Sequence, residues 1–168
     1  MKHKPMLYIM IGAPGSGKST FANKTFESKI DTIIVSRDNI RFKMLEDTDE
    51  YFAKEDKVFE AFYTSIADLL KKGIDVVADA THLHRTGRAK LINHINSIYA
   101  DYYITFIYMD SGLSICLDRN SHREGRARVP DNVIKNMYCQ IVKPTFYEFD
   151  NIIDIWTIDR NVLIDERR

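Results

Sequence analysis

Continuous apolar runs alternate with longer segments of mixed polarity along the chain. Five of these runs have the length and composition of strands that are buried on both faces, and they cover residues 6–11, 32–35, 74–78, 103–109 and 152–158. Chains with this alternation form a parallel sheet that is covered by helices on both faces. We therefore predict an α/β domain built around a parallel sheet of five strands.

Two of the intervening segments have an apolar face at helical spacing. The longer one, residues 53–72, is followed by Gly73, and Lys71 and Lys72 occupy its last turn, as is typical of a helix C-terminus. The shorter one begins at Pro130 and runs to residue 140. The apolar faces consist of Val58, Phe59, Phe62, Ile66, Leu69 and Leu70 in the first helix and of Val133, Ile134 and Met137 in the second.

Nothing in the sequence divides the chain. Its 168 residues contain no low-complexity linker and no internal repeat, so we expect a single domain over residues 1–168. No apolar run approaches the roughly twenty residues that span a membrane, and residues 1–5 are too few for a signal peptide. Cys116 and Cys139 have neither a metal-binding nor a redox spacing, which fits a reducing compartment. These features favour a cytoplasmic protein without a membrane segment.

The charge balance limits the kind of nucleic-acid contact that the protein can make. Lysine and arginine together number 24, as do aspartate and glutamate, so the formal net charge is zero. Proteins that grip long nucleic acids through their phosphates are usually basic overall or on one face. Any contact with nucleic acid is therefore expected to be short and local.

The turn after the first predicted strand carries the most specific pattern. Residues 12–19 match the P-loop pattern G-x-x-x-x-G-K-[ST], and the segment from Thr20 to residue 26 has the pattern of a following helix. A glycine-rich turn without function is the alternative, but the strand before the motif and the helix after it are the context that a phosphate-binding loop requires. The matching residues are Gly12, Ala13, Pro14, Gly15, Ser16, Gly17, Lys18 and Ser19.

The spacing of this P-loop has a physical reason. Glycines let the backbone wrap closely around an anion, so that successive N–H groups and the helix N-terminus point at phosphate oxygens. Lys18 is then placed to reach the β- and γ-phosphates, and the Ser19 hydroxyl is placed to ligate Mg²⁺. The motif therefore predicts ATP and Mg²⁺ as cofactors.

Ligands of such sheets gather at the carboxyl ends of the strands, so polar residues that follow a strand are candidates for the site. Asp38 follows the second strand at the start of a helix, and Arg41 lies three residues further on the same helical face. A carboxylate in this crevice could accept the proton of an attacking hydroxyl, as a kinase requires. Asp38 could equally cap the helix.

The third strand ends at Asp79, which has two interpretations. An acid that closes an apolar strand beside the P-loop strand resembles a Walker B aspartate, which holds Mg²⁺ or its water shell. A simple turn residue is the alternative. His82 and His84 follow, and we interpret them as polar loop residues because two histidines at this spacing lack a third metal partner.

After the fourth strand the composition becomes rich in arginine. We expect Asp110 and Ser111 to cap a helix through residue 117, and Arg119 and Arg123 then share one helical face. Their guanidinium groups suit phosphate oxygens, and also the charge on a phosphoryl group in transfer. A solvated basic loop is the alternative. Because a P-loop kinase needs a lid that neutralises charge, we favour a lid over residues 119–130, whose arginines are Arg119, Arg123, Arg126 and Arg128.

Taken together, four segments resemble the kinase domain of the bacteriophage polynucleotide 5′-hydroxyl kinases and their P-loop kinase relatives. In that family a G-x-P-G-S-G-K-S-T loop is followed by R-D-x-x-R, by a D-x-T-x-L-type strand end and by an R-N-x-x-R lid that leads to a V-P helix. The corresponding segments here, in the same order, are residues 12–20, 37–41, 79–83 and 119–130.

The resemblance implies a role for each matching residue. Lys18 and Ser19 would hold phosphates and Mg²⁺, and Asp38 would be the general base. Arg41 would help to place the acceptor, and Arg123 would stabilise the phosphoryl group in transfer. The implied fold is that of adenylate-kinase-like P-loop proteins.

The chain departs from the family pattern in three respects. Ala80 stands where the phage enzyme has its aspartate directly before the threonine, so that the acid here is Asp79. We expect no counterpart of the phosphatase domain of the phage enzyme within these 168 residues. Residues 37–60 contain five basic and eight acidic side chains, and this excess of negative charge would repel a polyanion if it lined the acceptor channel.

The sequence thus favours ATP-dependent phosphoryl transfer to an alcohol, with the 5′-hydroxyl of a nucleic acid as the preferred acceptor. A kinase for a small molecule, such as a nucleoside, a sugar or an antibiotic, is the nearer alternative and suits the acidic segment. A switch or binding protein that only hydrolyses ATP slowly is the more distant one, because a switch has no need to deprotonate an alcohol.

Overall fold

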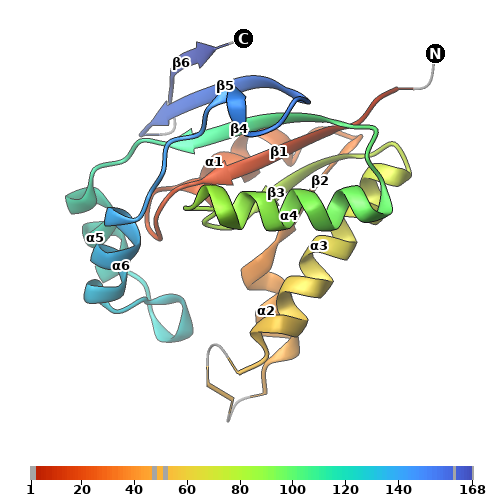
Figure 1. Cartoon of the computed structure of the whole chain (residues 1–168). Helices are drawn as coiled ribbons and strands as arrows, with labels where there is room; N and C mark the ends of the chain where they lie inside the picture. The colour runs from red at the N-terminus through yellow and green to blue at the C-terminus, as the bar shows by residue number, and fades with distance from the viewer. Residues whose placement is uncertain (1–2, 47–48, 51–52, 161, 168) are drawn as a thin grey trace.

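The fold is organised around one sheet of six strands. A computed structural model describes residues 3–46, 49–50, 53–160 and 162–167. The spatial order of the strands is β2-β3-β1-β4-β5-β6 (Figure 1). The first five strands are parallel, and β6 is antiparallel to β5. Their bounds are β1 Met6–Ile11, β2 Thr32–Ser36, β3 Asp75–Asp79, β4 Tyr103–Met109, β5 Ile152–Asp159 and β6 Val162–Arg167.

The sixth strand corrects the prediction of a five-stranded, wholly parallel sheet. A parallel strand needs a long crossover connection, whereas an antiparallel edge strand needs only a tight turn. Arg160, with φ 47°, lies in that turn, and Val162, Leu163 and Ile164 are exposed. An exposed edge strand lacks the long apolar run of a buried strand. For that reason the apolar pattern did not identify β6.

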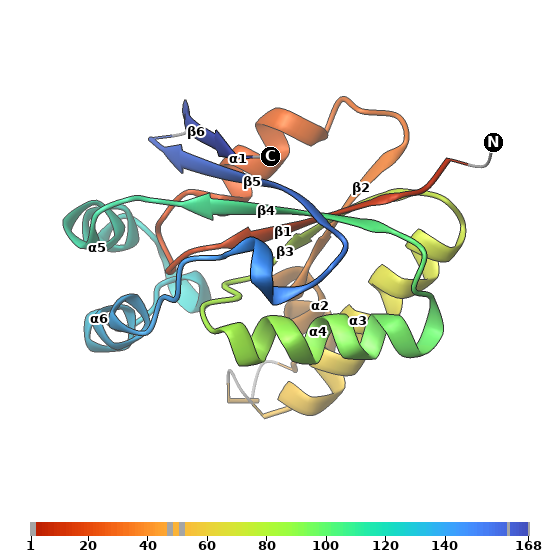
Figure 2. The same ribbon diagram turned by 45° about the horizontal axis from the view of Figure 1, so that its top comes forward.

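The two faces of the sheet are covered by different helices (Figure 2). One face packs against α3 (Glu55–Lys71) and α4 (Arg85–Ile98), while α1 (Lys18–Phe26) covers the other. Side chains of β1 alternate between the two cores: Leu7 and Ile9 pack on the α3–α4 side and Met10 packs with α1. A continuous apolar run is therefore required, because both faces of the strand are buried.

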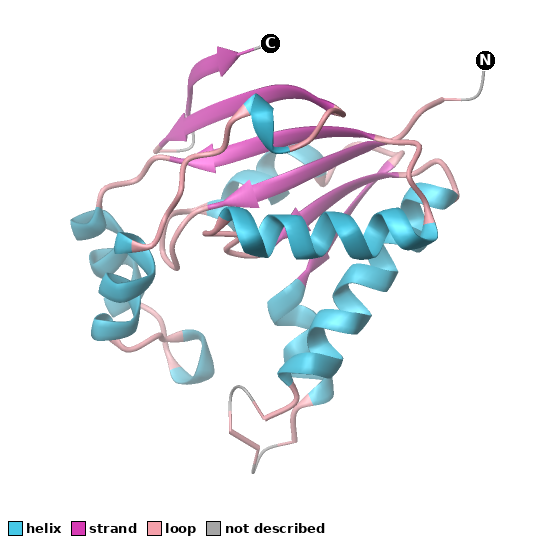
Figure 3. Ribbon diagram, viewed as in Figure 1, coloured by secondary structure: helices cyan, strands magenta, loops and turns pink. Residues whose placement is uncertain are grey.

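The central strands point their carboxyl ends toward a separate group of short helices (Figure 3). This group contains α5 (Leu113–Ser121), η1 (Gly125–Ala127) and α6 (Asp131–Cys139), and η2 (Phe146–Glu148) leads back to β5. A small core of Ala13, Cys116 and Ile134 joins α5 and α6 to the turn after β1. On the other side of this edge, α2 (Arg37–Met44) follows β2 directly and packs against α3.

A buried ion pair ties the connection between α6 and β5 to the sheet. Arg88 of α4 and Glu148 of η2 are both fully buried, and their closest charged atoms lie 2.6 Å apart. Arg88 also donates to the carbonyl oxygens of His82 and Val142.

Within the described residues, no helix is both long and apolar enough to cross a membrane.

Candidate active site

The P-loop turns sharply between β1 and α1. Gly15 has a φ of 82°, and a Cβ at this position would lie 2.3 Å from the carbonyl oxygen of Cys116. Gly17 has a φ of 97° and occupies the N-cap of α1. Both positions therefore require glycine, one for close approach to α5 and one for the left-handed backbone at the start of the helix. The N–H groups of the first helical turn have no intrahelical partner and suit an anion.

Lys18 is enclosed by this loop. Its Nζ donates to the carbonyl oxygens of Gly12 at 2.9 Å and Ala13 at 2.8 Å, and the residue is only 8% exposed. Burial lowers the pKa of Lys18 to about 8, and the nearby Asp79 carboxylate opposes the shift. An anionic ligand beside the ammonium group would favour its charged form. The loop and its lysine therefore fit the phosphates of a nucleotide.

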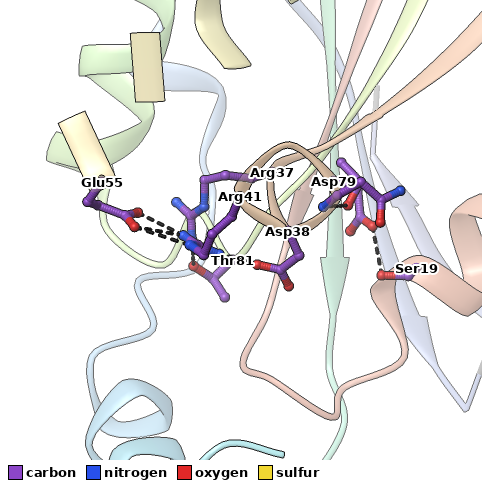
Figure 4. A network of polar contacts seen from close by, with 9 residues as sticks. Ser19, Arg37, Asp38, Arg41, Glu55, Asp79 and Thr81 are labelled. Atoms are coloured by element: carbon purple, nitrogen blue, oxygen red, sulfur yellow. Dashed lines mark hydrogen bonds and ion pairs between the residues drawn. The ribbon is translucent and has the colours of Figure 1, made fainter. Parts of the chain in front are cut away.

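Ser19 and Asp79 form a hydrogen-bonded pair beside Lys18. Ser19 Oγ donates to Asp79 Oδ2 at 2.7 Å (Figure 4). Burial raises the pKa of the Asp79 carboxyl, while the Ser19 hydrogen bond and Lys18 oppose this shift. A hydroxyl and a carboxylate are oxygen ligands of the kind that Mg²⁺ takes, so the pair fits this ion. Asp79 thus lies beside the P-loop, as the Walker B interpretation requires.

Asp38 lies in the first turn of α2, and its side chain is 61% exposed. The helix cap is supplied by Ser36 instead, whose Oγ accepts from the Asn39 N–H at 3.4 Å. The Asp38 carboxylate accepts a hydrogen bond from Arg41 Nη1 (Figure 4). It also contributes to the electrostatic surroundings of Asp79 and Lys18. The structure therefore brings Asp38 to the same edge of the sheet as the P-loop, with its carboxylate exposed.

Arg41 is held in place by Glu55, a residue that the sequence analysis did not identify. Arg41 is 1% exposed, and its Nη2 and Nε donate to Glu55 Oε1 at 2.8 Å and Oε2 at 3.2 Å. This two-point contact fixes the plane of the guanidinium group. Glu55 belongs to the first turn of α3, 14 residues beyond Arg41. An acidic residue in a first helical turn is common, so no local pattern indicates this pairing.

His82 corrects one of the sequence predictions. It lies in a loop after β3, as expected, but it is 8% exposed and has a positive φ of 42°. Its Nδ1 donates to the carbonyl oxygen of Met10 at 2.8 Å, and burial lowers its pKa to about 3. The loop turns back beneath the end of β1, which places the ring in the core. His84, by contrast, is exposed, and no metal-binding cluster of three or more His, Cys, Asp or Glu residues occurs in the described part of the chain.

The predicted caps of α5 are also corrected. The helix begins at Leu113 after Gly112, and no side chain caps it. Ser111 instead donates its hydroxyl to the carbonyl oxygen of Ser16 at 2.9 Å, and Arg119 Nη1 donates to the same oxygen at 3.2 Å. These two contacts fasten α5 to the outside of the P-loop.

Three arginines of residues 119–130 have separate surroundings, and the expected common helical face of Arg119 and Arg123 is wrong because α5 ends at Ser121. Arg119 contacts P-loop carbonyl oxygens, at 3.4 Å for Gly15. Arg123 is exposed and lies close enough to Lys18 to contribute to the lowering of its pKa. Arg126 Nη2 donates to the Glu46 carbonyl oxygen at 3.0 Å, in the connection between α2 and α3. The segment thus extends from the P-loop to the connection between α2 and α3, and these three arginines do not lie in one uniform patch.

Comparison with protein families adds an independent observation. Residues 7–144 match the model of the AAA domain family AAA_33, which is most of the chain. The chain belongs to this family. Its motifs and its fold therefore agree in identifying a P-loop protein.

Solved structures show the same fold. A chain of the Pnkp1/Rnl/Hen1 RNA repair complex is 26% identical, with a TM-score of 0.71, over 83% of this chain and 45% of that chain. The present chain thus spans less than half of that relative. A sugar kinase from Janibacter sp. is 19% identical (TM-score 0.57; 93% and 85% covered), and Kti12 from Chaetomium thermophilum with ADP-AlF3 is 14% identical (TM-score 0.65; 92% and 89% covered). The resemblance to polynucleotide kinases and the P-loop kinase fold are confirmed.

Proposed function

We propose that the protein transfers the γ-phosphoryl group of ATP to a hydroxyl group, most favourably the 5′-hydroxyl of a nucleic acid. The observation that carries this proposal is the position of Asp38. Its exposed carboxylate lies at the sheet edge that holds the P-loop, and the buried Arg41 orients it. A nucleotide-binding switch has no need for an oriented, exposed base at this position.

The P-loop side would hold the donor. Lys18 would bind the β- and γ-phosphates through its ammonium group, together with the N–H groups at the start of α1. Ser19 and Asp79 would hold Mg²⁺, which when bound neutralises phosphate charge. The hydrogen bonds of Lys18 to Gly12 and Ala13 keep its Nζ in place before any ligand arrives.

The reaction would begin at Asp38. Its carboxylate accepts the proton of the acceptor hydroxyl while the hydroxyl oxygen attacks the γ-phosphorus of ATP, and ADP leaves. Arg41, fixed by Glu55, keeps the carboxylate in position and would help to place the acceptor. Arg123 would neutralise charge on the phosphoryl group in transfer. We further propose that residues 119–130 act as a lid in a single kinase domain, with Arg119 near the bound phosphates.

Two observations support a nucleic-acid acceptor. The motif order matches polynucleotide kinases, and a chain of the RNA repair complex is among the similar structures, with 26% identity. In the acidic segment, Glu55 is paired with Arg41, and Asp49 with Lys54 at 2.7 Å, while the excess of three acidic side chains remains. Asp47 lies outside the described residues.

Both cysteines are free thiols, which agrees with our assignment of the reaction to the cytoplasm.

A small-molecule kinase is the second candidate, favoured by the remaining acidic excess in residues 37–60. Transfer of labelled γ-phosphate from ATP with Mg²⁺ distinguishes the two. The acceptors are a 5′-hydroxyl oligonucleotide, its 5′-phosphorylated control and a panel of nucleosides and sugars. Label on the 5′-hydroxyl oligonucleotide but not on its control supports the proposal, whereas label on a small alcohol alone favours the second candidate. Slow ATP hydrolysis that no acceptor alters would contradict both.

A further inference from the structure

Two buried side-chain atoms that follow the neighbouring strands β2 and β3 have no hydrogen-bond partner in the part of the chain that the structure describes. They are Arg37 Nε and His82 Nε2. Arg37 directly precedes Asp38 in the sequence, and His82 follows the strand that ends in Asp79. Polar atoms that are buried without a partner are costly and rare in folded proteins. Neither atom has a role in the mechanism proposed above.

The two atoms are chemically complementary. A carbonyl oxygen can only accept, so the contact between His82 Nδ1 and the Met10 carbonyl oxygen fixes the proton on Nδ1. His82 Nε2 therefore carries a lone pair and is an acceptor. Because burial keeps the pKa of His82 near 3, the ring remains neutral at physiological pH. Arg37 Nε, in contrast, always carries a hydrogen and is a donor.

Both groups lie over the same aromatic face of α3. The Arg37 guanidinium lies over the Phe59 ring, with 5.0 Å to its centroid, and the His82 ring stacks on Phe62 with 6.0 Å between centroids. Phe59 and Phe62 are three residues apart, so they are neighbours on the helix surface. Thr81 also links the two groups, because its Oγ1 accepts from Arg37 Nη2 at 3.5 Å and His82 is the next residue.

One kind of ligand satisfies both atoms at once. A hydroxyl oxygen can accept the Arg37 Nε hydrogen while its own hydrogen is donated to the His82 lone pair. A fully ionised phosphate or carboxylate cannot donate, and its charge would face the lone pair. The two atoms together therefore favour a neutral hydroxyl over an anion.

We propose that Arg37 Nε and His82 Nε2 form a buried hydroxyl-binding subsite beside Asp38. The hydroxyl is that of a water molecule or a second hydroxyl of the phosphate acceptor, such as a ribose hydroxyl. With an acceptor hydroxyl, the subsite distinguishes acceptors that differ by a single hydroxyl group, because only one of them satisfies both atoms. This second case rests on the proposed kinase function, while the subsite itself does not.

The first test uses the unmodified full-length chain with ¹⁵N-labelled histidine. Nuclear magnetic resonance of the free protein is expected to show His82 protonated at Nδ1, with Nε2 accepting a hydrogen bond. Magnetisation transfer between this site and water identifies water as the source. A proton on Nε2 would overturn the proposal. The proposal would also be overturned if Nε2 accepts no hydrogen bond in the free protein and none with acceptor and ADP bound. Because this readout needs no phosphoryl transfer, it stands even where every acceptor fails.

The second test identifies an acceptor hydroxyl. His82→Phe keeps a flat ring on Phe62 but removes the lone pair, and His84→Phe changes an exposed histidine two residues away as a control. The acceptors are adenosine with its 2′- and 3′-deoxy analogues, and a 5′-hydroxyl RNA with the matched DNA. For each protein we measure the ratio of kcat/KM for the acceptor with the extra hydroxyl to kcat/KM for the acceptor without it. A drop of about tenfold in the preference for one extra hydroxyl, in His82→Phe alone, supports an acceptor hydroxyl. Equal ratios together with a water-bonded Nε2 support a water molecule.

Discussion

The two sides of the candidate site are built by different means. The donor side is defined here as residues 12–20 with Ser111 and Arg119. Its chemistry depends on the path of the backbone, because glycines form the turn, carbonyl oxygens hold Lys18, and N–H groups are available at the start of α1. On the acceptor side, defined as Arg37, Asp38, Arg41, Glu55, Thr81 and His82, side chains from separate elements hold one another. Under the proposed function, the donor side would bind phosphates mainly through the backbone, and the specificity for the acceptor would depend on side chains.

The largest expected effect concerns the backbone of the donor side. Gly15→Ala places a Cβ 2.3 Å from the Cys116 carbonyl oxygen at a positive φ, so the loop must move. We expect ATP affinity to fall by at least about 100-fold, because the phosphate contacts depend on the loop path. Titration calorimetry measures this loss. Gly73→Ala is the control, because Gly73 also has a positive φ but no atom within 4 Å of its added Cβ; an equal loss there would contradict the explanation.

The matching change on the acceptor side is Glu55→Gln. It removes the charge that fixes Arg41, and the buried guanidinium then loses its two-point partner. We expect kcat to fall about 10- to 100-fold while ATP affinity is unchanged, because only the acceptor side is disturbed. Steady-state kinetics with direct ATP binding separates the two quantities. Asp56→Asn, an exposed neighbour on α3, should leave both unchanged; a loss of ATP binding in Glu55→Gln would show that the two sides are not separable.

The pH dependence of ATP binding tests the donor side at Lys18. Its pKa of about 8 in the folded protein lies below the usual 10.5, so the ammonium group loses its proton as the pH rises through 8. ATP affinity should fall about tenfold from pH 7 to pH 9 as a result. Stability in the absence of ATP should instead rise between pH 8 and 10.5, because the unfolded chain then binds more protons than the folded one. Lys18→Arg stays charged and should lose both effects; a wild-type protein without them would contradict the assignment.

The smallest expected effect is the loss of one side chain from the donor side. Ser111→Ala removes a hydrogen bond to the Ser16 carbonyl oxygen, but Arg119 still donates to this oxygen. We expect a loss of about 1 kcal/mol in the free energy of unfolding and little change in kcat. Denaturant unfolding measures it, with the exposed Ser114→Ala as the control. A loss of activity as large as that of Glu55→Gln would remove the distinction between the two sides.

The same distinction explains what the sequence could predict. The P-loop and the five parallel strands are local patterns, and each of these five strands begins and ends within one residue of its predicted bounds. Glu55 could not be found because its pairing with Arg41 joins two helices and leaves no local pattern. The burial of His82 depends on a positive φ and a stack on Phe62, which no periodicity encodes. The β6 strand was missed because an exposed edge strand lacks the long apolar run of a buried one.

The central claim is that Asp38 activates an acceptor hydroxyl for attack on ATP. The most direct measurement is single-turnover phosphoryl transfer by Asp38→Asn at saturating ATP, alongside its ATP affinity by calorimetry. Asparagine retains a carbonyl oxygen for Arg41 but cannot take up the proton. The account predicts transfer at least about 100-fold slower than in the wild type, with ATP affinity unchanged. Transfer at the wild-type rate, with normal ATP binding, would contradict it.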